Sequence, residues 1–150
     1  MGLLSERLNS HRVLGLDTSV FIYHIEAHPV YLPLTQEVLT GVQAGNWQAV
    51  TSVITLMELT VHPWRLNLPS VAKEYEALLI GFPHLTVADV TKEIAQQAAQ
   101  LRAHARLKPA DALQVATALV HDATAFVTND KSLRRLEPTL DVIILNDFIP

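Results

Sequence analysis

The chain contains no cysteine and few charged or aromatic residues. Of its 150 residues, 49% are hydrophobic, 17% are charged and 6% are aromatic. The absence of cysteine excludes a disulfide scaffold, a thiolate zinc site and a cysteine nucleophile. The large apolar fraction excludes intrinsic disorder as the main state, because the chain has ample apolar surface to bury. We expect a single domain over residues 1–150, with residues 1–12 as an N-terminal extension.

The sequence also lacks segments typical of secretion or membrane insertion. Residues 1–12 contain no apolar core of signal-peptide length. The longest uncharged run, residues 38–57, contains glycine, asparagine and glutamine and is interpreted as two elements joined by a turn. We therefore expect a cytoplasmic protein that makes no membrane contact. The mean hydropathy of +0.23 is high, which favours a surface covered by a partner or by a second copy in a homodimer.

Basic side chains are few overall but concentrated in one part of the chain. The formal net charge is −4, so no global positive field attracts nucleic acid. Residues 100–135 nevertheless contain six basic and three acidic side chains. A solvated surface explains this excess as well as a surface that binds RNA phosphates does. The candidate phosphate-binding residues are Arg102, Arg106, Lys108, Lys131, Arg134 and Arg135.

Short apolar runs alternate with helical patterns along the chain. The predicted strands cover residues 13–16, 47–51, 85–87, 125–127 and 142–145. The predicted helices cover residues 20–27, 34–44, 53–61, 69–79, 91–107, 109–120 and 132–136. This alternation predicts an α/β fold of three layers, in which a five-stranded parallel sheet is covered by helices on both faces. In such sheets ligands bind at the carboxyl ends of the strands.

Four acidic residues lie in apolar surroundings at that predicted edge. Asp17 directly follows the first strand, and Asp130 follows the fourth. Glu58 lies in the helix after the second strand, and Asp111 in the first turn of the helix before the fourth. Each aspartate alone is explained by helix capping or by the helix dipole, whereas Glu58 beside apolar residues needs a partner.

Taken together, the four acids favour a metal site. Clustered carboxylates repel one another unless they are protonated or bridged by a cation. A set of oxygen ligands without histidine or cysteine favours Mg²⁺ or Mn²⁺. The usual chemistry of such a site is phosphodiester hydrolysis, in which the metal lowers the pKa of a bound water and shields the phosphate.

Two other site types fit the sequence less well. Phosphoaspartate hydrolases also place an aspartate after the first strand, but they need a second acid at the position that Ser19 occupies here. Their receiver relatives place a Lys-Pro pair after a late strand, whereas Lys108 follows a predicted helix. His24 and His28 have the i, i+4 spacing of two zinc ligands, but no third ligand is nearby.

Four blocks of sequence resemble the PIN-domain family, whose best-populated branch is the VapC-like toxin ribonucleases of bacterial toxin–antitoxin pairs. The blocks are GLDTSVFI at 15–22, TSVITLMEL at 51–59, KPADALQVATA at 108–118 and FVTNDKSL at 126–133. Any one of them is a weak signal, but four in order over nearly the whole chain are fairly specific. The dozen residues before the first strand depart from the toxins, which usually begin almost at that strand.

The resemblance implies a PIN-like fold and an endoribonuclease that depends on Mg²⁺ or Mn²⁺. Asp17 and Asp111 would be the principal metal ligands, with Glu58 and Asp130 completing the acidic pocket. Thr128, and Thr18 or Ser19, match the small polar residues that the family places beside the metal. The implied partners are an RNA substrate and a cognate antitoxin that inserts a basic side chain among the acids. One alternative is a stand-alone PIN nuclease without an antitoxin. The other is a PIN module that binds RNA or protein without cleaving it.

Overall fold

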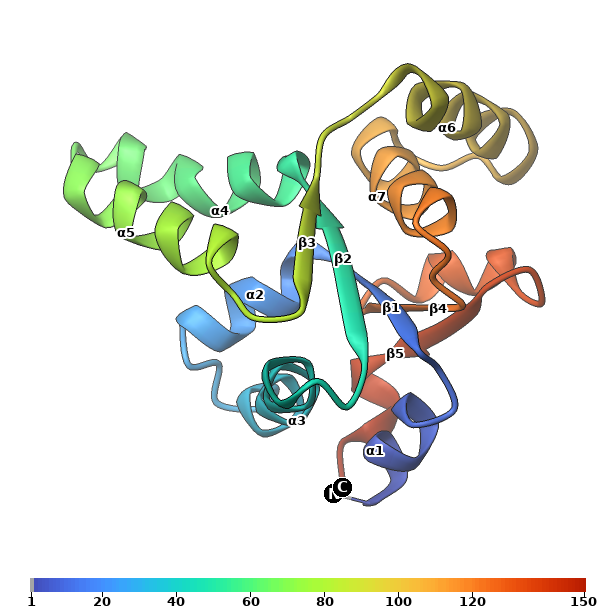
Figure 1. Cartoon of the computed structure of the whole chain (residues 1–150), viewed down its shortest axis with the longest axis horizontal. Coiled ribbons are helices and arrows are strands. Elements are labelled where there is room, and N and C mark those ends of the chain that lie inside the picture. The colour runs from blue at the N-terminus through green and yellow to red at the C-terminus, as the bar shows by residue number, and fades with distance from the viewer. Residues whose placement is uncertain (1) are drawn as a thin grey trace.

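All five predicted strands form, and they pair in parallel in one sheet (Figure 1). The computed structural model describes residues 2–150. The strands are β1 (Val13–Leu16), β2 (Gln48–Ser52), β3 (Leu85–Ala88), β4 (Ala125–Thr128) and β5 (Asp141–Ile144). Their order is β3-β2-β1-β4-β5, so the chain winds outward in both directions from a central β1. The carboxyl ends of β1 and β4 therefore meet at the point where a doubly wound sheet binds its ligand.

The helices lie on both faces of this sheet, so the predicted α/β/α architecture is confirmed. One face is covered by α1 (Gly2–Leu8), α2 (Thr18–Ile25) and α3 (Leu32–Ala44), and the other by α6 (Lys92–Ala105) and α7 (Pro109–Val120). Two further helices, α4 (Val53–Arg65) and α5 (Pro69–Ile80), form an arm that extends sideways from the sheet (Figure 1). The short 3-10 helices are η1 (Lys131–Leu136) and η2 (Leu145–Phe148). None of the helices described is long and apolar enough to cross a membrane.

Two apolar cores hold the layers together, because alternate strand residues point to opposite faces. In β4, Val127 packs in the core beneath α2 and α3, whereas Phe126 packs in the core beneath α6 and α7. Gly15 of β1 allows α7 to approach closely. A Cβ atom at that position would lie 2.5 Å from the Cβ of Ala118 in α7. This close approach matters for the site, since α7 carries Asp111.

Several helix ends differ from the prediction, and two of the differences have a clear local explanation. Helix α2 begins at Thr18 rather than residue 20, because the Asp17 side chain accepts a hydrogen bond from the Thr18 amide and caps the helix. Helix α4 continues to Arg65 rather than ending at residue 61, with Pro63 inside it. Proline removes one backbone donor, but the next turn still forms, as the Leu66 amide bonds to the His62 carbonyl at 3.1 Å.

The N-terminal extension contains a helix that the sequence patterns did not predict. In α1, Leu4 and Leu8 are buried, with 1% and 0% of their surface exposed. Arg7 forms a two-pronged ion pair with Asp141 at the start of β5. This pair lowers the pKa of Asp141, and His11 Nε2 lies 2.8 Å from the same carboxylate. Residues 2–12 are thus fastened to the amino end of the sheet, opposite the acidic residues.

If α1 is part of the core, Leu8→Ala should lower the free energy of unfolding by about 2–5 kcal/mol, because it leaves a cavity under the sheet. Leu3→Ala is the matched control, since Leu3 lies in the same helix and is 74% exposed. Urea denaturation of the two variants and the wild type measures the difference. Equal stability of both variants would show that α1 does not pack as described.

Candidate active site

The carboxylate of Asp17 lies where β1 ends and α2 begins. Its backbone amide donates to the Val127 carbonyl of β4 at 3.0 Å, which continues the pairing of β1 with β4. One carboxylate oxygen accepts from the Thr18 amide at 2.9 Å, and the other from the Thr128 hydroxyl at 2.7 Å. The pKa of Asp17 is raised to about 6, chiefly by burial. The two hydrogen bonds oppose this rise, and the charges of Asp111 and Glu58 contribute to it.

Asp111 is partly buried in the first turn of α7. Burial raises its pKa, and the charges of Asp130 and Glu58 act in the same direction, whereas the charge of Lys108 lowers it. Asp111 is thus coupled to Asp17, Glu58 and Asp130, and Asp17 is also coupled to Glu58. The repulsion that the sequence analysis expected is therefore present in the folded chain.

Glu58 and Asp130 are held in different ways. Glu58 is exposed rather than buried in apolar surroundings, and its carboxylate accepts from the Thr18 hydroxyl at 2.5 Å. The carboxylate of Asp130 accepts from the amide and the hydroxyl of Ser132 at 2.9 and 2.7 Å, so it also caps η1. Its backbone amide donates to Thr128, the residue that bonds Asp17.

A buried layer of polar side chains lies beneath the acids, and the sequence analysis did not single it out apart from Thr18. Gln114 of α7 is 3% exposed and donates to the hydroxyls of Thr18 and Thr55 at 3.0 and 2.7 Å. Its carbonyl oxygen accepts from Ser52 at the end of β2. The available signal was a polar residue within the otherwise apolar segment of residues 112–116, because a buried amide needs partners.

The six candidate phosphate-binding residues divide into two groups. Arg134 pairs with Asp147, Arg135 donates to the carbonyls of Ser132 and Ala105, and Arg102 donates to that of Leu107. The other three are exposed, and their side chains make no hydrogen bond or ion pair with residues 2–150. They are Arg106, Lys108 and Lys131. Lys108 is near the acids, since its charge acts on Asp111.

The donor set suits a hard divalent cation, although no cation site is fully assembled. Within residues 2–150, no three Asp, Glu or His side chains are arranged to hold one ion as they stand. The side chains available are oxygen donors, which Mg²⁺ and Mn²⁺ prefer. Ser19 follows Asp17 by two residues, and its buried hydroxyl has no partner in the described part of the chain. Ligation would require the carboxylates to draw together. The His24 and His28 pair offers no alternative, because His28 Nδ1 already accepts from two backbone amides.

An apolar groove leads from the acids along the arm. The groove has two sections. Glu58 and Glu26 line the first section, and the second is almost wholly apolar. Both sections are lined by Ile25, Leu59 and Tyr75. The remaining residues of that second section are Phe21, His24, Leu39, Leu78, Leu79 and Phe82. The groove thus offers apolar surface that ends at negative charge.

The sequence matches the model of a known protein family. The model of the PIN domain matches residues 15–137, which include all four acids. The chain belongs to the PIN domain family. PIN domains generally use divalent metal ions, in agreement with the oxygen donors here.

Solved structures support the same PIN fold. A toxin–antitoxin complex from Klebsiella pneumoniae is similar with a TM-score of 0.65 and 21% identity, over 89% of this chain and 97% of that one. VapBC2 from Rickettsia felis, bound to a DNA fragment from the promoter, has a TM-score of 0.65 and 23% identity, over 87% of this chain and 96% of that one. FitAcB from Neisseria gonorrhoeae has a TM-score of 0.63 and 20% identity, over 89% of this chain and 97% of that one. A comparison with curated proteins finds no match.

The raised pKa of Asp17 predicts that Asp17→Asn stabilises the metal-free protein. The carboxyl binds its proton more tightly in the folded chain than in the unfolded chain, where its pKa is about 3.9. The wild-type free energy of unfolding should therefore fall as the pH rises from about 4 to above 6. Asparagine also caps helices, so at pH 8 we expect the variant to be more stable by about 1–2 kcal/mol.

Urea denaturation in EDTA at pH 4.5 and pH 8 tests this, and the advantage of the variant should shrink at the lower pH. Asp141→Asn is the control of opposite sign, since the Arg7 ion pair lowers the pKa of Asp141 and the substitution should destabilise the protein at pH 8. An Asp17→Asn protein less stable than wild type at pH 8 would contradict the electrostatic account.

Proposed function

We propose that this PIN domain is an endoribonuclease of the VapC-like toxin type that depends on Mg²⁺ or Mn²⁺. The observation that carries the proposal is the meeting of Asp17, Glu58, Asp111 and Asp130, from four separate segments, at one edge of the sheet. A domain that only binds RNA or protein gains nothing from acids that repel one another. Thr128 supports the same role, since its hydroxyl orients the carboxylate of Asp17.

Different residues of the site would bind the cation and the RNA phosphates. Asp17 and Asp111 would be the principal ligands of the cation, and Glu58 and Asp130 would complete its acidic surroundings. A bound divalent ion would supply Lewis-acid activation of the phosphodiester and of the attacking water. Lys108 would hold a neighbouring phosphate, because it is exposed and close to Asp111.

The remaining basic residues would contribute to phosphate binding from further away. Arg106 and Lys131 are exposed, and neither side chain forms an ion pair with an acid among residues 2–150. Arg102, Arg134 and Arg135 would first have to exchange their present partners for RNA phosphates. The proposal therefore ranks the contribution of Lys108 above that of Arg135.

Asp111→Asn should abolish RNA hydrolysis while the fold remains intact, because it removes one charge from the acidic site without a change of size. Cleavage of a mixed pool of single-stranded and structured RNA with Mn²⁺, Mg²⁺ or EDTA measures this, with circular dichroism as the check on folding. Asp122→Asn is the matched control, as Asp122 is exposed in the turn before β4. Full activity of Asp111→Asn would disprove the assignment. Absence of cleavage by folded wild type with every metal would favour the binding module.

We also propose an antitoxin partner that occupies the groove. The similar structure from Klebsiella pneumoniae is a toxin–antitoxin complex. The groove of this chain is apolar along the arm and ends at Glu58 and Glu26. Such a surface suits a partner segment that has apolar side chains followed by a basic one. That basic side chain would compete with the cation for the carboxylates.

Substitution in the groove should weaken such a complex. If a small reading frame lies upstream of this chain's gene, its product is the probe and is produced together with the chain; absence of such a frame would favour a stand-alone PIN nuclease. Leu78→Glu should weaken binding at least tenfold, because Leu78 lines the groove and 59% of it is exposed. Ile80→Glu is the control, since Ile80 is an exposed residue of the same helix that lies outside the groove. Equal binding of both variants to the partner would rule out the groove as its site.

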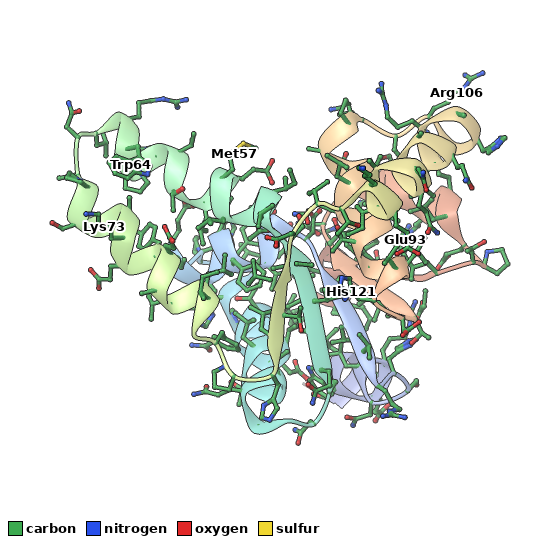
Figure 2. The ribbon with its side chains drawn as sticks, turned by 45° about the horizontal axis from the view of Figure 1, so that its top comes forward. Met57, Trp64, Lys73, Glu93, Arg106 and His121 are labelled. Carbon is green, nitrogen blue, oxygen red and sulfur yellow. The ribbon has the colours of Figure 1, made fainter. Side chains whose placement is uncertain are left out.

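The outer surface of the arm supports the expected homodimer. Met57, Val61 and Trp64 are exposed and follow one another at helical spacing along α4. Figure 2 labels Met57 and Trp64 on this helix. An apolar stripe of this kind is unusual on a monomer and fits contact with a second copy. Association through α4 would place the two acidic sites near one another, because Met57 adjoins Glu58 in the sequence.

A further inference from the structure

We propose that Gln114 is a positioning residue for the acidic site. It directs the Thr18 hydroxyl toward Glu58 and sets the spacing of the three elements that carry Asp17, Glu58 and Asp111. This inference rests on the proposed metal-dependent activity and deepens it, since it concerns how the carboxylates are held. Gln114 is buried and contacts no acid directly, so its effect would pass through its hydrogen-bond partners.

The directions of the hydrogen bonds follow from the number of protons available. The Thr51 hydroxyl donates to the Leu16 carbonyl at 2.9 Å, so its oxygen accepts from Thr55 at 2.7 Å. The amide nitrogen of Gln114 uses its two protons for the oxygens of Thr55 and Thr18. The Thr18 and Thr55 hydroxyl oxygens are also 3.0 Å apart, but the only proton of Thr55 is already used for Thr51. The single proton of Thr18 goes to the Glu58 carboxylate, which is nearer at 2.5 Å and charged.

The orientation of Gln114 itself is also determined. Its carbonyl oxygen accepts from the Ser52 hydroxyl at 2.8 Å, and the Ser52 oxygen in turn accepts from the Ile54 amide at the start of α4. A reversed amide would place an N–H donor against Ser52 and leave Thr18 and Thr55 without one. The network is satisfied in only one direction, and it ends on a carboxylate of the acidic site.

Three members of the layer lie within three residues of an acid in the sequence. Gln114 follows Asp111 by three residues in α7, and Thr55 precedes Glu58 by three residues in α4, so each pair shares one face of its helix. Thr18 directly follows Asp17. The three-way contact of Gln114, Thr55 and Thr18 therefore lies one turn beneath three of the four carboxylates, and it fixes the distances between α7, α4 and α2.

The test is the affinity for Mn²⁺ alone, measured by electron paramagnetic resonance in the absence of RNA. Gln114→Leu keeps the approximate volume and removes both donors, and we expect Mn²⁺ to bind at least about tenfold more weakly, as for other residues that orient metal ligands. Thr117→Val is the matched control. Thr117 is 0% exposed in the same helix, and its hydroxyl donates only to the Leu113 carbonyl of that helix.

The melting temperature of both variants separates positioning from general stability. We expect the two to lose similar stability and only Gln114→Leu to lose Mn²⁺ affinity. Wild-type affinity in Gln114→Leu would overturn the positioning role and leave the proposed nuclease intact. Absence of Mn²⁺ binding in the wild type would overturn both. A loss of affinity in Thr117→Val as large as that in Gln114→Leu would reduce the effect to core packing and also overturn the inference.

A measurement on the wild type covers the case in which Gln114→Leu does not fold. The side-chain amide protons of Gln114 should exchange slowly, and their NMR signals should shift on titration with Mg²⁺. Gln100 provides the reference, because it is exposed on α6. Signals of Gln114 that move no more than those of Gln100 would overturn the coupling between this amide and the acidic site.

Discussion

Asp17, Glu58, Asp111 and Asp130 come from different segments, and the sheet brings their charges to one edge. Such a cluster costs stability, because burial and mutual repulsion disfavour the charged forms. The surrounding structure offsets part of the cost through hydrogen bonds from Thr18 and Thr128 to Asp17. A bound divalent cation would offset the unfavourable free energy that remains, because its charge would relieve the repulsion between the carboxylates. The acidic cluster therefore lowers the stability of the metal-free protein, as functional sites commonly do.

Two features of the packing keep the carboxylates near one another. Gly15 lets α7 lie against β1, which brings Asp111 toward Asp17. Beneath the acids, the amide of Gln114 joins α7 to α2 and α4. A polar layer of this kind is favourable only when every member has a partner, and here each hydroxyl and amide proton has one. The same arm that carries Glu58 also forms the groove that suits an apolar partner.

The fold and the acids were accessible from the sequence, because apolar runs and the acids that follow them are local patterns. The family model confirms the PIN resemblance that these patterns suggested. Helix α1 was missed because its two core residues, Leu4 and Leu8, make too short a pattern to identify. The continuation of α4 past Pro63 and the pairing of Arg135 with backbone carbonyls depend on tertiary contacts. The partners of Gln114 are up to 96 residues away in the chain, so no local pattern could supply them.

The central claim is that carboxylates of the described edge bind one kind of hard cation together. The most direct measurement is the melting temperature of the wild type during titration with Mn²⁺, against NaCl at equal ionic strength. A ligand at 100 times its dissociation constant adds about 2.7 kcal/mol of stability. The account predicts a saturable rise for Mn²⁺ that is absent in a double variant with Asp17→Asn and Asp111→Asn. No rise in the wild type, or an equal rise in the double variant, would contradict it.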